Sequence, residues 1–171
     1  MRAALPVTAA VAFFALVAIA CDPVHSDAVS ALGGEAPGVR SGPTHRAGQP
    51  CLLCHDGALG NPPQFTVAGT VYVKPNDASA SNAANGASVQ MTAANGSTYT
   101  AETNQVGNFY VTPGQWTPTY PMKVTVVYQG LTVPMQTHIG RDGSCSGCHL
   151  NHVAFDSPGP IAVAWPDGGV P

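Results

Sequence analysis

Two short stretches of the sequence share one arrangement of residues that can do chemistry. Residues 51–55 read CLLCH and residues 145–149 read CSGCH, so each has two cysteines three positions apart and a histidine directly after the second. Paired cysteines of this kind occur in three settings: a metal-binding site, a disulfide, and a site of covalent haem attachment. Which one applies depends on the compartment of the protein and on which other histidines can reach the motifs.

The N-terminus indicates export. Arg2 is followed by the apolar run VTAAVAFFALVAIA, which ends in small residues just before Cys21. A charged start, an apolar middle and a small-residue end are typical of a signal peptide, which we assign to residues 1–20. The alternative is a transmembrane anchor, but the run is shorter than the roughly 20 residues that span a bilayer.

Cys21 is the one cysteine outside the two motifs. The sequence AIAC resembles the lipobox of bacterial lipoproteins, although Ala18 stands where that pattern more often has Leu or Val. The resemblance implies lipidation of Cys21, a lipid anchor in a membrane, and a periplasmic or cell-surface location. The alternative is an ordinary signal peptide that leaves Cys21 as a spare thiol.

Composition excludes some classes of partner. Only 9% of the 171 residues are charged and the formal net charge is −3, so the six Lys and Arg cannot form the concentrated basic surface of a nucleic-acid-binding protein. A hydrophobic fraction of 44% is enough for a folded core. The sixteen Pro and nineteen Gly favour strands and turns over long helices.

Haem attachment explains more of the two motifs than the alternatives do. Two cysteines at i and i+3 lie on one side of a helical turn, so both sulfurs can reach one edge of a flat ring with the histidine under the iron. Four thiolates would suit structural zinc, but zinc gives no reason for the two histidines. A thioredoxin-like pair needs a βαβ context, which is absent from the sequence. A disulfide between such close neighbours cross-links very little chain.

The motifs resemble those of multihaem c-type cytochromes, in which the cysteines form thioethers with the haem vinyl groups and the histidine is an axial ligand. The resemblance implies two covalent haem c groups, the first held by Cys51, Cys54 and His55. The second would be held by Cys145, Cys148 and His149.

The second axial ligands are less narrowly defined. The stretches THRAGQPCLLCH and THIGRDGSCSGCH share a Thr-His pair upstream of the motif, which makes His45 and His138 the first candidates. His152 is the third, because its position three residues after His149 resembles that of histidines that bind a neighbouring haem. The alternative for each is an ordinary surface histidine. We expect His25 to be unligated and the methionines to fill the core.

The sequence predicts a mainly β protein in which a small sandwich is flanked by two irregular or short-helical haem segments. The predicted order is a flexible tether over 21–44, a first haem segment over 45–64, a sandwich over 65–137, and a second haem segment with the tail over 138–171. In FTVAGTVYV, the alternation of Phe65, Val67, Val71 and Val73 predicts a strand with one buried face. Pro134 predicts an edge strand, and residues 76–87 (NDASASNAANGA) predict a polar surface loop.

The run VAGTVYV and the longer run GASVQMTAANGSTYTAETNQVGNFYV resemble the carboxypeptidase regulatory-like domain. That resemblance implies a prealbumin-type sandwich that serves as a scaffold, without peptidase activity.

Together these features predict an exported dihaem cytochrome c that carries single electrons through bis-His haems and exchanges them with other cytochromes, with self-assembly conceivable. We expect an electron carrier rather than an enzyme, and no catalytic residues. Two alternatives stay open. One is a haem enzyme or sensor, for example dihaem peroxidase-like, with an open iron site that CO would bind rapidly. The other is a binding module, for which Trp116 and Tyr120 offer few aromatic contacts.

Overall fold

The computed structural model describes residues 23–57 and 63–164, and the chain divides between Gly33 and Gly34 into two compact units. The expected signal peptide and Cys21 lie outside the described residues. In the first unit, α2 (Pro23–Ala31) begins with a proline, whose fixed φ suits the first position of a helix. This helix differs from the flexible tether expected over 21–44. None of the helices described is long and apolar enough to cross a membrane.

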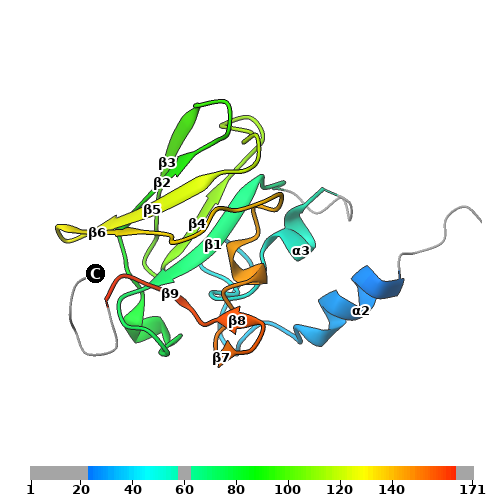
Figure 1. Cartoon of the computed structure of the whole chain (residues 1–171). Coiled ribbons are helices and arrows are strands. Elements are labelled where there is room, and N and C mark those ends of the chain that lie inside the picture. Colours follow the sequence, from blue (N-terminus) through cyan, green and yellow to red (C-terminus); the bar gives the residue numbers. More distant parts are fainter. Residues whose placement is uncertain (1–22, 58–62, 165–171) are drawn as a thin grey trace, which may run out of the picture. The chain divides into compact units, whose positions relative to one another are not determined.

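The second unit is built on two sheets (Figure 1). One has the strand order β4-β1-β9 and consists of β1 (Val67–Tyr72), β4 (Asn108–Val111) and β9 (Ile161–Ala162). The other has the order β3-β2-β5-β6 and consists of β2 (Ser88–Thr92), β3 (Thr98–Glu102), β5 (Lys123–Tyr128) and β6 (Leu131–Pro134). The smaller elements are α3 (Leu52–His55), η1 (Ala80–Asn82), η2 (Cys145–Gly147) and a pair of two-residue strands, β7 (Val153–Ala154) and β8 (Ser157–Pro158). The mainly β fold is therefore confirmed.

A two-residue turn places β6 next to β5 in the larger sheet. Gln129 and Gly130 both have positive φ, 49° and 84°, the conformation of a two-residue hairpin turn, and they connect β5 to β6. Because Pro134 has no N–H to donate to a further strand, it suits β6, which lies at the edge of its sheet as predicted.

One hydrophobic core is formed by side chains of both sheets. Its fully buried members include Val67, Val71, Val89, Met91, Phe109, Val111, Met122 and Val163. Met91 and Met122 are thus core residues, as expected. Trp116 and Tyr120 pack against this core, and the Trp116 indole N–H donates to the Ser97 hydroxyl, so both are packing residues.

Strand β1 differs from the prediction, because all six of its residues are buried rather than one face of it. Side chains alternate along a strand, so Val67 and Val71 face the core while Thr70 and Tyr72 face the other side of the sheet. Thr70 and Tyr72 are only 2% and 1% exposed. The second face of β1 must therefore be covered, and the segment before the first CxxCH motif provides that cover.

Two further predictions need correction. The stretch 76–87 is not wholly a surface loop: Ala84 and Ala87 are fully buried, and the Asn82 side chain is tied to the backbone of Lys74 by hydrogen bonds in both directions. The sandwich also does not end at residue 137, because β9 pairs in parallel with β1. The first difference arises from a bridge between Tyr72 and Ala83. The second arises from pairing between segments that are far apart in the sequence, which local patterns do not reveal.

Candidate functional site

Each CxxCH motif forms a single helical turn. In the first, the backbone N–H groups of Cys54 and His55 donate to the Cys51 carbonyl at 3.2 and 3.0 Å. In the second, Cys148 and His149 donate in the same way to Cys145, at 3.2 and 2.9 Å. The turn places the two cysteines of a motif on one side, which is the arrangement that the spacing predicts.

The second motif lies in a loop that begins and ends beside β1. Ser144 forms a parallel bridge with Ala68, and Ile161 in β9 pairs in parallel with Val71. Both contacts involve β1, so residues 145–160 project from it between them. Gly69 permits this close approach, because a Cβ on it would lie 2.7 Å from the Cys145 Cβ.

The segment before the first motif packs on the outer face of β1 and β4. The Gly48 N–H donates to the Thr70 hydroxyl at 2.7 Å, and that hydroxyl donates to the Asn108 side chain at 2.7 Å. The Asn108 amide in turn donates to the His45 carbonyl at 3.0 Å. These buried bonds fix the backbone of His45 on the sheet.

The two motifs lie next to each other. Figure 1 shows α3 and the orange turn of the second motif side by side near β1. Asn151 lies so close to Gly48 that a Cβ there would clash with its side chain. Cys51 also lies near enough to Cys145 to add to the rise that burial causes in the pKa of Cys145. Segments that are 94 residues apart in sequence, counted between Cys51 and Cys145, therefore share one region of the unit.

The two motif histidines have the same hydrogen-bonding arrangement. His55 Nδ1 lies 2.8 Å from the Pro63 carbonyl oxygen, and His149 Nδ1 lies 2.9 Å from the Gly159 carbonyl oxygen. A carbonyl only accepts, so Nδ1 must carry the proton in both rings. The lone pair is then on Nε2, and a second hydrogen bond of this kind is what orients a metal-ligating histidine.

His45 lies beside His55. Their ring centroids are 5.9 Å apart with an interplanar angle of 49°. One metal ion bound by two imidazoles at about 2 Å each holds the ring centroids roughly 6 Å apart. The separation is therefore compatible with one metal ion held by both imidazoles. His45 belongs to the same segment as the first motif.

The other candidate histidines have no such neighbour among the described residues. His138 and His152 are both exposed, and no aromatic or imidazole ring contacts either of them within residues 23–57 and 63–164. His25 lies on α2, in the other unit.

The cysteines are neither paired nor activated. Cys51, Cys54, Cys145 and Cys148 are all free thiols. Burial raises the pKa of Cys51 to about 11. Burial, followed by the nearby charges of Cys51 and Asp142, raises the pKa of Cys145 to about 12. Reactive redox cysteines have lowered pKa values, so these shifts are opposite to those of a thioredoxin-like pair.

Within the described ranges no three His, Cys, Asp or Glu side chains come together as ligands of one ion. The four motif cysteines therefore do not form the four-thiolate zinc site that the sequence left open. A haem iron takes only two axial ligands from the chain, so this finding does not bear on haem.

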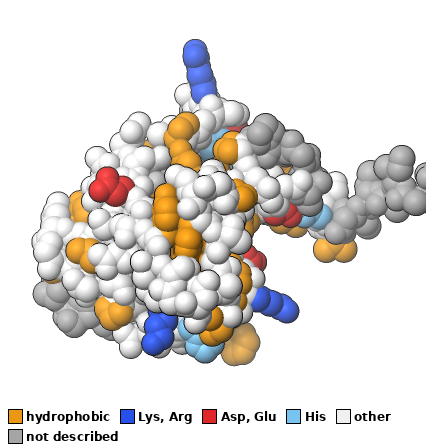
Figure 2. Space-filling view, turned by 90° about the horizontal axis from the view of Figure 1, so that it is seen from above, with side chains coloured by type: hydrophobic (Ala, Val, Ile, Leu, Met, Phe, Trp, Pro, Cys, Tyr) orange, Lys and Arg blue, Asp and Glu red, His pale blue; other side chains and the backbone are white. Residues whose placement is uncertain are grey.

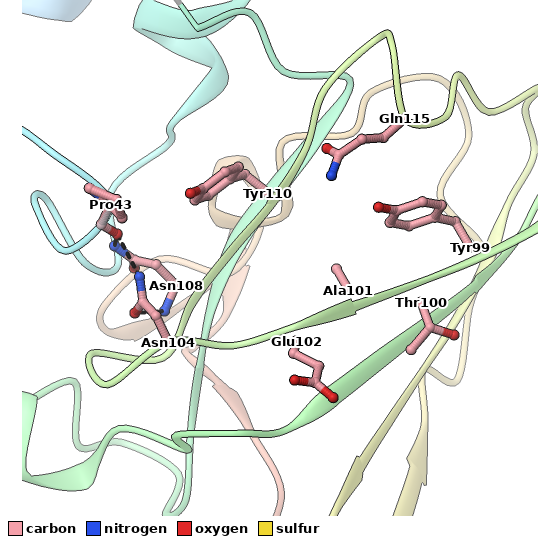
Figure 3. A pocket seen from close by; sticks show the side chains of 9 residues that line it. All are labelled: Pro43, Tyr99, Thr100, Ala101, Glu102, Asn104, Asn108, Tyr110 and Gln115. Carbon is pink, nitrogen blue, oxygen red and sulfur yellow. Dashed lines mark hydrogen bonds between the residues drawn. The ribbon is translucent and has the colours of Figure 1, made fainter.

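A pocket of about 290 Å³ lies next to the first motif segment, where β3 and β4 approach each other (Figure 3). Tyr99 and Gln115 point toward each other across it, while Asn104 and Asn108 lie at its Pro43 end. Both amides donate to the Pro43 carbonyl, at 2.6 and 3.3 Å, so they are already engaged in holding that segment. Tyr110 connects the pocket to the motif, because its ring stacks on Phe65, which contacts His55.

Charge is sparse on the surface. Figure 2 shows Lys and Arg side chains standing singly on the face in view, with no basic cluster between them.

Sequence reasoning missed several residues that hold the site. Glu35 contacts the ring of His45. Thr70 and Asn108 fix the backbone of the segment that carries His45, and Gly159 supplies the carbonyl that His149 contacts. Only Glu35 carried a signal, since it is one of two glutamates in the chain. The others act through contacts between distant parts of the chain.

No known protein family matches the chain, and no curated protein or solved structure is significantly similar to it.

Proposed function

We propose that the protein is an extracytoplasmic dihaem cytochrome c that carries single electrons. The observation that carries this proposal is the common state of the two motif histidines. Each follows a CxxC turn and each has Nδ1 committed to a backbone carbonyl, which leaves Nε2 available for iron. Two unrelated structural histidines would have no reason to share this arrangement.

The residues present fit haem c, which when bound supplies an iron that cycles between Fe(III) and Fe(II). Cys51 and Cys54 would hold one haem through thioethers, and Cys145 and Cys148 the other. His55 and His149 would bind the irons through Nε2. Because each of these sulfurs would be a thioether, none of the four cysteines would remain as a thiolate ligand.

The second axial ligand is assigned differently at the two motifs. At the first, the 5.9 Å separation from His55 favours His45. Ligation by two histidines gives a lower reduction potential than ligation by histidine and methionine, and we therefore expect a low potential for this haem. At the second, His138 and His152 remain candidates.

The setting of this function is also a proposal. We propose export through residues 1–20, a lipid anchor on Cys21, and electron exchange with other redox proteins, including cytochromes. These proposals agree with the five cysteines, one of which lies outside the motifs, and with the sparse surface charge.

The test is a pyridine haemochrome assay on denatured protein made in a host that attaches haem c. We expect two covalent haems per chain, and one in each of the double variants Cys51→Ala/Cys54→Ala and Cys145→Ala/Cys148→Ala. Each variant loses one pair of thioether bonds and leaves the other motif intact.

The fifth cysteine offers a matched control. Cys21→Ser removes a thiol outside both motifs, so it should retain two haems. Absence of covalent haem from the wild-type protein, despite competent maturation, would refute the proposed function.

A further inference from the structure

The imidazole ring of His45 lies beside the carboxylate of Glu35, a residue to which the proposed function assigns no role. Glu35 Oε1 lies 3.2 Å from His45 Nδ1 and accepts a hydrogen bond from Arg46 Nε at 3.1 Å. The side chains of His45 and Glu35 are 25% and 29% exposed, so both are largely shielded from water. The carboxylate, His45 and Arg46 thus form one part-buried group of charged and titratable side chains.

The local backbone holds this group in place. Arg46 has a φ of 49°, a left-handed conformation that is uncommon for a residue other than glycine and persists where surrounding contacts enforce it. Its Nη1 donates to Gln49 at 2.8 Å, so the guanidinium spans Glu35 and Gln49. The His45 carbonyl is held by Asn108. His45 is thus fixed through its backbone carbonyl, and its ring lies in contact with the Glu35 carboxylate.

From this geometry we propose that Glu35 is the positioning residue of His45, holding Nδ1 toward its carboxylate so that Nε2 is the nitrogen left for iron. This inference rests on the proposed function. His55 has a neutral carbonyl at its Nδ1, whereas His45 has a charged carboxylate. A carboxylate partner makes the imidazole a stronger donor, which favours Fe(III) over Fe(II) and lowers the potential of the first haem.

The test compares the only two glutamates of the chain. Glu35→Gln keeps the size of the side chain and an oxygen that can accept from Nδ1, but removes the charge. Glu102→Gln makes the same change on exposed Glu102 of β3. In a redox titration of the two-haem protein, we expect Glu35→Gln to weaken the preference of one haem for Fe(III) about tenfold. That corresponds to a potential about 59 mV higher for a one-electron couple. Glu35→Ala should raise it further, and Glu102→Gln should leave both potentials unchanged.

The low-spin ferric spectrum is a second readout, because loss of stability alone would not alter the signal of one haem and leave the other unchanged. Glu35→Gln should alter the low-spin signal of one haem while the count of covalent haems stays at two. Equal potentials in Glu35→Gln, Glu102→Gln and the wild type would overturn the role of Glu35 and leave the proposed function standing. A His45→Ala variant with an unchanged low-spin spectrum would overturn it as well. A wild-type protein without covalent haem would overturn both proposals.

Discussion

At the scale of single residues, the site depends on which atom of each side chain is already engaged. His55 and His149 use Nδ1 for a backbone carbonyl, and His45 directs Nδ1 to Glu35. His55 and His149 therefore present Nε2, and His45 would present the same nitrogen with its Nδ1 beside the carboxylate. The cysteines differ from one another in access, since Cys145 is buried and Cys148 in the same motif is exposed.

This difference predicts the order in which thiols react in protein made without haem. At pH 8 an ordinary thiol is about one quarter ionised, whereas a thiol with a pKa of about 11 is roughly one part in a thousand ionised. Alkylation by iodoacetamide, followed by peptide mass spectrometry, should label exposed Cys148 first and Cys145 last, with Cys51 more than about a hundredfold slower than a free thiol.

The labelling of Cys51 should accelerate as the pH rises toward 11, because deprotonation produces the reactive thiolate. In urea all four motif cysteines should react alike. Labelling of Cys145 in the folded protein as fast as Cys148 would contradict the burial described above.

At the scale of elements, β1 organises both motifs. Its outer face receives the segment with His45, and its edge receives the ends of the loop with His149. Thr70 and Asn108 are buried polar side chains that join the first segment to the sheet, and Asn104 adds a bond to Pro43.

Asn108→Asp tests this connection. The substitution removes the amide that donates to the carbonyls of His45 and Pro43 and places a carboxylate against them. The Pro43 carbonyl keeps its bond from Asn104, whereas the part-buried His45 carbonyl loses its donor, which costs about 1–3 kcal/mol. We expect a loss of that size in urea unfolding, together with a changed spectrum of the first haem only.

Asn95→Asp is the matched control. The Asn95 side chain accepts from the Ser97 N–H and hydroxyl through its Oδ1, and an aspartate oxygen can do the same. Its effect should stay below about 0.5 kcal/mol. Equal stabilities for the two variants would exclude the anchoring role of Asn108.

At the scale of the whole molecule, the second unit brings a late segment of the chain, β9, into the sheet beside the early strand β1. β9 completes the sheet beside β1, and Val163 just after it is 1% exposed and belongs to the core. Residues 161–163, which follow the second motif, are therefore part of the sandwich.

Val163→Ala should consequently destabilise the fold. Removing two buried methyl groups costs about 2 kcal/mol through lost burial and the cavity that remains. Val153→Ala is the control, since Val153 lies in the same segment but is 61% exposed. Urea unfolding should separate the two variants, and similar midpoints would argue against a core position for Val163.

The sequence by itself determined the features that depend on neighbouring residues. The CxxCH spacing predicted the helical turns, the alternation in 65–73 predicted the strand β1, and Pro134 predicted the edge strand. Such features follow from backbone geometry within a few residues. The chemical assignment of the motifs also began there, and haem attachment remains a prediction.

Only the tertiary structure decided how the distant parts meet. It buried both faces of β1, added β9 to the sheet, and brought Glu35 to His45 and Cys51 near Cys145. Strand pairing and side-chain contacts across tens of residues depend on which surfaces can be buried together, and no local pattern encodes that choice. For this reason the sequence indicates which residues could bind haem, while the fold determines which histidine lies beside which.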